Sequence, residues 1–392
     1  MKKKILQIQH WLDEKQIDGW LIYDNHGSNR FAHKLLEIPP HLVITRRFFY
    51  WIPRQGEPKK ILHTIESESL NMLPGLKYLY LSWTDLEKVL EKVLNRVKVV
   101  IMEYSPRNLN PNISVVDAGT IEVIRSFGIE IKSSADLVQH HTSVLNESQI
   151  ASHFEAATVL ETIFSKVWDL IANAIWKKQN ITEYDVQKFI LSEFTAYNCI
   201  TEDSPTCSVN EHSALPHYRA RKDHAHVIRK GDFILIDMWC KKNVPESIYA
   251  DLTRVGIAAP QPTPYQEEVF KIVKGGLIET IDYIDHHIKR GLSGCEVDDF
   301  CRQYITRAGY GEYFIHRTGH NIDTHVHGAG VNFDNLEMAD HRKILPGMCF
   351  SIEPGIYLSG TFGVRIEYNL LIASDYSIRI TGGKEENIIC FL

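Results

Sequence analysis

The sequence predicts an α/β domain at the amino end of the chain and a larger α+β domain after it. The chain has 392 residues, which exceeds the roughly 150 residues of a typical single domain. Helix-like and strand-like segments alternate in the first third, whereas helices and paired strands are segregated afterwards. A polar seam near 140–147 separates the two patterns, so we place the domains at 1–143 and 144–392.

The elements of the amino-terminal domain are predicted from hydrophobic periodicity. Apolar residues recur with helical spacing over 3–15 and 84–97. Apolar, β-rich runs at 19–23, 42–51 and 97–103 predict strands. This alternation is typical of an α/β domain. The region contains neither a glycine-rich phosphate loop nor a cluster of candidate catalytic residues.

The second domain combines long helical patterns with strands that pair as hairpins. Its predicted helices cover 148–176, 182–197, 263–289 and 295–308, and its predicted strands cover 232–239, 248–258, 347–353 and 363–373. The helices are separate from the strand pairs along the chain, which favours an α+β arrangement.

The composition excludes several classes of protein. A net charge of −6 is mild for this length and gives no reason to expect nucleic acid as a partner. No run reaches the ~18 apolar residues of a membrane span. The seven cysteines are odd in number and form no CxxC pair, so neither a thiolate zinc site nor a disulfide framework is expected. We therefore expect a cytoplasmic protein.

Acidic residues inside apolar strands are the most informative feature. Asp237 ends one apolar run, Asp251 lies in a second, Glu353 ends a third, and Glu367 lies inside a fourth. An unpaired carboxylate is costly to bury, so each needs a partner. The one obvious cation nearby, Arg365, cannot match four acids. A pair of divalent metal ions would neutralise all of them together.

Local geometry supports the grouping of these acids. Turn-forming residues between Asp237 and Asp251 predict a hairpin that brings the two together. Arg365 and Glu367 are two residues apart and would share a strand face, so the arginine would orient the acid and keep it ionised. Taken singly, each acid fits a cap, a turn or an ion pair, and only their joint occurrence favours a metal site.

A cluster of histidines adds to the pattern. Four lie within twelve residues: His316, His320, His325 and His327. The zincin helix motif is absent, because Arg317 replaces its glutamate and Gly319 disfavours a helix. A solvated polar loop is the alternative interpretation of the cluster. Carboxylates with one imidazole form a mostly hard ligand set, which suits manganese.

Together these residues resemble the pita-bread metallopeptidases, which include Xaa-Pro aminopeptidases, prolidases, methionine aminopeptidases and creatinase. The order Asp, Asp, His, Glu, Glu is that of the family. The matching segments are 236–237, 249–254, 316–320, 350–357 and 363–367. The region before residue 147 is similar in layout to the amino-terminal domain of the creatinase and proline-peptidase branch. The resemblance therefore implies a creatinase-like α/β domain followed by a pita-bread catalytic domain.

The resemblance also implies a metal centre. Asp251 and Glu367 would bridge two divalent ions, Asp237 would complete one site, and His320 and Glu353 would complete the other. Manganese is our first choice, with cobalt, zinc and iron as alternatives. The metals would activate water for attack on the scissile carbonyl, and Glu353 would pass a proton to the leaving nitrogen.

Further residues are expected to contact the substrate. In similar proteins a histidine seven residues after the metal histidine steadies the intermediate, and here that residue is His327. His217 corresponds to a histidine near the scissile bond, although by itself it also fits a surface role. His316 corresponds to a pocket histidine of the proline-specific branch. We also count Arg365 among the substrate contacts.

The resemblance implies hydrolysis of Xaa-Pro bonds at the amino end of short peptides, in a homodimer. The sequence does not separate an Xaa-Pro aminopeptidase from a dipeptidase, which would need an arginine for the free carboxylate of its substrate. Two alternatives are a metal-free creatinase-like hydrolase and an inactive pita-bread module that binds a partner. The intact set of five ligands argues against both.

Overall fold

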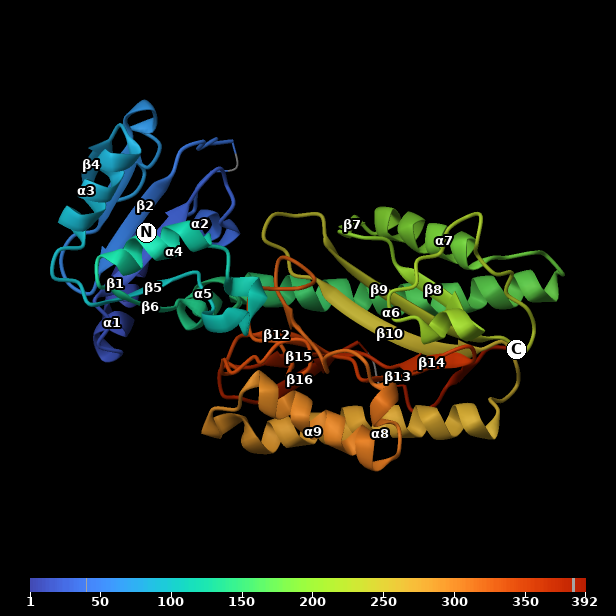
Figure 1. Cartoon of the computed structure of the whole chain (residues 1–392). Coiled ribbons are helices and arrows are strands. Elements are labelled where there is room, and N and C mark those ends of the chain that lie inside the picture. The colour runs from blue at the N-terminus through green and yellow to red at the C-terminus, as the bar shows by residue number, and fades with distance from the viewer. Residues whose placement is uncertain (40, 383–384) are drawn as a thin grey trace. The chain divides into compact units, whose positions relative to one another are not determined.

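The computed structural model describes residues 1–39, 41–382 and 385–392. They form two compact units, Met1–Thr142 and Ser143–Leu392 (Figure 1). The first is an α/β unit and the second combines sheets with long helices, as the sequence predicts. Within the described residues, no helix is both long enough and apolar enough to cross a membrane.

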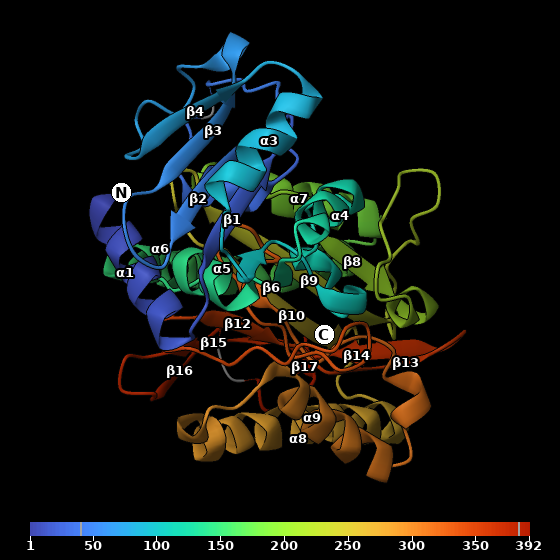
Figure 2. The ribbon, with the colours of Figure 1, turned by 60° about the vertical axis from the view of Figure 1, so that its left-hand side comes forward.

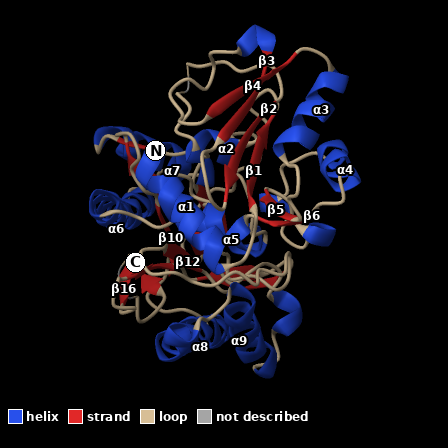
Figure 3. Ribbon diagram, turned by 90° about the vertical axis from the view of Figure 1, so that its left-hand side faces the viewer, coloured by secondary structure: helices blue, strands red, loops and turns tan. Residues whose placement is uncertain are grey.

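The first unit is built on one six-stranded sheet in the order β4-β3-β2-β1-β5-β6. The strands are β1 (Gly19–Asp24), β2 (Phe48–Pro53), β3 (Lys59–His63), β4 (Leu76–Tyr80), β5 (Val99–Met102) and β6 (Glu130–Ser133). The helices are α1 (Lys2–Glu14), α2 (Arg30–Leu35), α3 (Trp83–Val93), α4 (Ala118–Ser126) and α5 (Ala135–Thr142) (Figure 3).

Helices cover both faces of this sheet. Leu21 and Tyr23 of β1 pack in one core with α3 and α4, while the alternate residues Trp20 and Ile22 are buried on the opposite face. The predicted strand at 42–51 begins only at Phe48. β3, β4 and β6 were not predicted from the sequence, because they are short and carry exposed or polar residues.

The second unit places its helices on either side of its sheets (Figures 1 and 2). The long helices are α6 (Glu147–Trp176), α7 (Glu183–Ala196), α8 (Pro264–His287) and α9 (Gly294–Arg307). Each begins with a capping box, in which the residues before and inside the first turn exchange hydrogen bonds. These helices agree with the predicted ranges to within two residues.

The strands of this unit form three groups. The largest sheet contains β7 (Cys199–Ile200), β8 (Thr206–Val209), β9 (Phe233–Lys242), β10 (Ala250–Ile257) and β17 (Ile389–Cys390). A second contains β11 (Asn321–Ile322), β12 (Cys349–Ile352), β15 (Tyr368–Ile372) and β16 (Ile378–Thr381). The hairpin of β13 (Gly355–Leu358) and β14 (Phe362–Arg365) is separate.

The two faces of β9 belong to different hydrophobic cores. Ile234 and Ile236 pack with α6 and α7, whereas Phe233 and Leu235 pack with α8, α9 and the β13–β14 hairpin. Side chains alternate along a strand, so Asp237 shares the face of Phe233 and Leu235. The acid therefore points into the space between the sheets.

One predicted strand was wrong in detail. The run at 363–373 is two strands, β14 and β15, and Glu367 lies in the two-residue junction between them, not inside a strand. At this junction the backbone N–H of Glu367 donates to the carbonyl of Thr253, 3.2 Å away. This bond to β10 fixes Glu367 where the chain passes from the hairpin into the neighbouring sheet.

A close backbone contact holds two other site segments together. The N–H of Ser351 donates to the carbonyl of His320 at 2.8 Å, and the N–H of Glu353 donates to the carbonyl of Thr318 at 2.8 Å. Gly319 lies between these bonds, and a Cβ atom there would be 2.2 Å from the carbonyl oxygen of Ser351. Only glycine allows this approach.

We expect Gly319→Ala to lower the free energy of unfolding by about 1–3 kcal/mol, because the added methyl group forces the two segments apart. Chemical denaturation measures this change. Gly119→Ala is a suitable control, since its Cβ would meet nothing closer than the Asp117 carboxylate at 3.3 Å. An alanine at 319 with wild-type stability would contradict the expected clash.

Candidate active site

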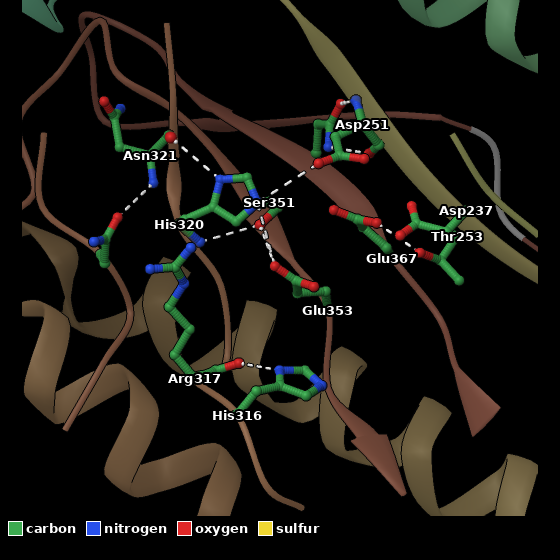
Figure 4. Close-up of polar contacts among 12 residues, drawn as sticks. Asp237, Asp251, Thr253, His316, Arg317, His320, Asn321, Ser351, Glu353 and Glu367 are labelled. Carbon is green, nitrogen blue, oxygen red and sulfur yellow. Dashed lines mark hydrogen bonds and ion pairs between the residues drawn. The ribbon is translucent and has the colours of Figure 1, made fainter. Parts of the chain in front are cut away.

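One cavity in the second unit gathers every residue that the sequence analysis selected for a site. Its volume is about 370 Å³. The residues on its wall include His217, Asp237, Asp251, His316, His320, His327, Glu353, Arg365 and Glu367. They come from β9, β10, the ends of β12 and β14, and the loops between, so residues far apart in the chain meet here (Figure 4).

The antiparallel pairing of β9 and β10 brings the two aspartates together. Asp237 lies opposite Thr253, and Asp251 lies opposite Trp239. The aspartates are therefore diagonal neighbours on one face of the hairpin. The predicted hairpin is present, but β9 continues to Lys242, so the turn begins later than the sequence suggested.

Glu367 reaches the same place from the β14–β15 junction. The hydroxyl of Thr253 donates to Glu367 Oε2 at 2.8 Å, and Arg254 Nη1 donates to the Glu367 carbonyl at 2.6 Å. Both residues belong to β10, so the strand that carries Asp251 also fixes the position of Glu367. The two acids are almost completely buried, with 5% and 1% of their surfaces exposed.

His320 turns an unprotonated nitrogen toward the acids. Its Nδ1 lies 3.2 Å from the carbonyl of Asn321, which can only accept, so Nδ1 carries the proton. Its Nε2 lies 3.6 Å from Asp251 Oδ2 and 3.3 Å from Glu353 Oε1 (Figure 4). Burial, with the charge of His327, holds the pKa of His320 well below its usual value. A lone pair therefore faces two carboxylates.

The acids strongly perturb one another. Burial, followed by the charges of Asp237 and Glu353, raises the pKa of Asp251 well above its usual value. Burial and the neighbouring acids, Asp251 first, raise the pKa of Glu367 in the same way. Burial raises the pKa of Glu353 to about 7, against the opposing charges of Arg365 and then Arg317. The chain itself supplies too little positive charge for these groups.

Three buried carboxylate oxygens on the wall of this cavity have no hydrogen-bond partner among the residues that the structure describes. They are Asp237 Oδ1, Asp251 Oδ1 and Glu367 Oε1. One carboxylate oxygen each of Asp251 and Glu367 and one ring nitrogen of His320 all lie within 4.8 Å of one another, and each could bind a metal ion. Unpaired acceptors of this kind are costly unless a cation binds them. The donor set therefore fits bound divalent metal.

Arg365 binds a different acid from the one expected. Its Nη2 donates to Asp237 Oδ2, and its Nε lies 3.9 Å from Glu353 Oε2. It reaches Glu367 only through Thr253, whose hydroxyl accepts from Arg365 Nε at 3.1 Å. Because Arg365 is buried and bonded to the acids, its contribution here is to position them.

The remaining histidines lie around the acids. His316 Nδ1 donates to the carbonyl of Arg317 at 2.7 Å, so its Nε2 accepts from the Tyr357 hydroxyl at 2.7 Å. His327 packs edge-on against His320, with ring centres 4.5 Å apart. His217 lines the cavity from the loop after β8.

Glu183, which holds the loop carrying His217, was not predicted from the sequence. Its buried carboxylate accepts hydrogen bonds from Val209 N, His212 Nδ1, Tyr218 Oη and His226 N. Side-chain atoms of Glu183, His212 and His226 also lie close enough to one another to hold a metal ion. The Glu183 carboxylate, however, already accepts the hydrogen bonds named above. In the sequence Glu183 is one acid in a helical first turn, and only its burial reveals this role.

Comparison with known proteins decides the family. Residues 152–374 match metallopeptidase family M24. The chain belongs to this family. It is 25% identical to an uncharacterized peptidase of Staphylococcus saprophyticus over 97% of this chain and 99% of that protein. It is 33% identical to an Xaa-Pro dipeptidase of Pyrococcus furiosus over 44% of this chain and 46% of that protein.

Solved structures share the fold of this M24 peptidase along its whole length. The dipeptidase PepE from Mycobacterium ulcerans gives a TM-score of 0.72 at 18% identity, covering 100% of this chain and 97% of that one. An Xaa-Pro dipeptidase from Bacillus anthracis gives 0.66 at 22% identity, covering 99% of each chain. The resemblance to the pita-bread peptidases and the predicted fold class are confirmed.

We expect Asp251→Asn to stabilise the metal-free protein at neutral pH. The pKa of Asp251 is raised in the folded state, so its ionised form lowers stability as the pH rises above the usual aspartate value. The variant removes that charge and should gain on the order of 1 kcal/mol in unfolding free energy. The gain should vanish near pH ~4, where an unfolded aspartate also takes up its proton.

Unfolding of both proteins in a chelator and in added manganese measures these effects. Manganese should stabilise the wild type and have little effect on the variant. Asp203→Asn, an exposed acid on the cavity rim, should change stability by less than about 0.5 kcal/mol in either condition. A metal-free Asp251→Asn protein less stable than wild type would refute the electrostatic argument.

Proposed function

We propose that this M24 peptidase uses two divalent metal ions to cleave Xaa-Pro bonds at the amino end of short peptides. The observation that carries the proposal is the convergence of four acids and one unprotonated imidazole in a cavity where three carboxylate oxygens lack partners. The names of the relatives, which include Xaa-Pro dipeptidases, support the substrate class.

In this proposal the ligands are those expected from the sequence. Asp237, Asp251, His320, Glu353 and Glu367 would together hold the two metal ions. Four carboxylates and one imidazole favour manganese over softer ions, with cobalt, zinc or iron as alternatives. Bound metal would lower the pKa of a water molecule and polarise the scissile carbonyl.

Glu353 has the properties of a proton carrier. Its carboxylate lies on the cavity wall 3.3 Å from His320 Nε2, where it could contact both the metal centre and a bound peptide. The Ser351 hydroxyl donates to Glu353 Oε1 at 3.1 Å and fixes the orientation of the carboxylate. We propose that Glu353 delivers a proton to the leaving nitrogen, which for an Xaa-Pro bond is the proline nitrogen.

The histidines would recognise the reacting group. His327 and His217 both line the cavity, and burial, followed by the charge of Arg317, lowers the pKa of His327 to about 4. A neutral imidazole donates a hydrogen bond through its N–H group, so we assign His327 to steadying charge on the scissile oxygen. We assign His217 to the region around the scissile bond. Burial and the charge of Arg365 lower the pKa of His316 to about 3, so it contributes as a neutral pocket residue.

We expect Glu353→Ala to reduce peptide hydrolysis by at least 10³-fold while leaving the fold intact, because both a ligand and the proton carrier are lost. Turnover with manganese and the circular dichroism spectrum measure the two effects. Glu202→Ala is a matched control, since Glu202 lies on the same cavity wall and its carboxylate bonds the exposed His325. Near wild-type turnover of Glu353→Ala would exclude the assigned role.

A peptide library tests the substrate class directly. Purified protein loaded with manganese or cobalt should cleave peptides with proline in second position, and a chelator should stop the reaction. Peptides that differ only by alanine in place of that proline should be poorer substrates by about tenfold or more. Equal rates on both sets would disprove the Xaa-Pro assignment while leaving peptidase activity in place.

A further inference from the structure

Three arginines line the cavity, and they differ in what they bind. Arg365 is buried and donates to Asp237 and Tyr357. Arg219 is exposed and donates to Asp203 at 2.7 Å. Across the described part of the chain, the guanidinium of Arg317 forms neither a hydrogen bond nor an ion pair. It is therefore the arginine of this cavity whose charge is available to a ligand.

The backbone of Arg317 is held firmly even though its guanidinium is unpaired. Its N–H donates to Glu337 Oε1 at 3.1 Å, and its carbonyl accepts from His316. The next residue, Thr318, donates to Asp298 Oδ1 through both its N–H and its hydroxyl, at 2.9 and 2.7 Å. The structure thus fixes where the side chain starts and leaves its charged end free.

The side chain extends from the backbone next to His316 toward the part of the site that holds His320 (Figure 4). Arg317 lines the same cavity as His320, His327 and Glu353. The guanidinium therefore lies on the side of the site that holds His320 and Glu353, where Glu353 would meet the leaving nitrogen (Figure 4).

The chemistry of the substrate makes this location significant. In an Xaa-Pro dipeptide, the leaving nitrogen and the free carboxylate are attached to the same proline Cα. A cation near the leaving nitrogen is thus also near that carboxylate. In a longer peptide or an amide, the same position carries an uncharged amide group. A guanidinium binds a carboxylate through two parallel charge-assisted hydrogen bonds and binds an amide far more weakly.

We propose that Arg317 binds the free carboxylate of the substrate, so that this chain acts as a dipeptidase in preference to an aminopeptidase of longer peptides. The inference rests on the proposed function, because it places the leaving nitrogen beside Glu353. It adds the residue that discriminates by peptide length, which the sequence alone did not identify.

The test compares an Xaa-Pro dipeptide with its carboxyl-terminal amide and with an Xaa-Pro-Yaa tripeptide, using the full chain loaded with manganese. The wild type should favour the dipeptide by about tenfold or more in kcat/KM. Arg317→Gln should lose roughly 10- to 100-fold on the dipeptide, mainly through KM, and less than about threefold on the amide. Arg317→Lys should retain part of the preference, because it keeps the charge without the planar fork.

Arg219→Gln is the matched control. It removes another arginine from the wall of the same cavity, and the dipeptide preference should stay at the wild-type value. Metal content and thermal unfolding of each variant show whether the protein is loaded and folded. Equal losses of Arg317→Gln on dipeptide and amide would overturn the proposal, because they would show that Arg317 acts on Glu353 alone.

Failure of the proposed function has a different signature. If dipeptides without proline are cleaved equally well, the Xaa-Pro assignment fails, and the acid-versus-amide comparison is made with those dipeptides. If no peptide is cleaved, calorimetry with the Xaa-Pro dipeptide and its amide measures binding alone. Tighter binding of the dipeptide that is lost in Arg317→Gln supports the inference, and equal binding of both compounds refutes it.

Discussion

The burial of carboxylates on one face of the β9–β10 hairpin is the constraint on which the site depends. That face also carries Phe233, Leu235 and Val255, which pack in a hydrophobic core. Strand alternation puts Asp237 and Asp251 into the same space, where burial opposes the ionisation of Asp251. The fold can hold ionised acids there only if positive charge accompanies them.

The surrounding side chains form one connected hydrogen-bond network around these acids. Arg365 donates to Asp237 through Nη2, and its Nη1 donates to the hydroxyl of Tyr357 at 3.0 Å. Tyr357 donates to His316, and His316 donates to the carbonyl of Arg317. Each donor has a defined acceptor, so the orientation of each group is fixed by the next. The network links an acid of the proposed metal centre to the backbone of the proposed substrate-binding arginine.

The sequence revealed the long elements and the ligand types well. Strands such as β9 and β10 are continuous apolar runs, and acids interrupt them visibly. The break between β14 and β15 was missed because Ile366 keeps the run apolar through the junction. What ends the strand there is the bond from Glu367 N–H to Thr253, a contact between distant segments that local patterns do not encode.

Pairwise charge assignments were the least predictable part of the site. Arg365 and Glu367 are neighbours in sequence, which favoured their pairing, yet strand packing places Asp237 closer to the guanidinium. Glu183 shows the same limit, because an acid in the first turn of a helix is ordinarily exposed. Its partners, Val209 and Tyr218, come from segments that approach only in the folded chain.

Formal charges favour two metal ions in the proposed centre over one. Asp237, Asp251, Glu353 and Glu367 contribute −4 when ionised, and Arg365 contributes +1, which leaves −3. One divalent ion would leave −1, so an acid would still lack a counter-charge in a buried site. Two would leave +1, which favours loss of a proton from water at the centre. Arg317 is not needed for this balance, and its charge therefore remains for an anionic group of the substrate.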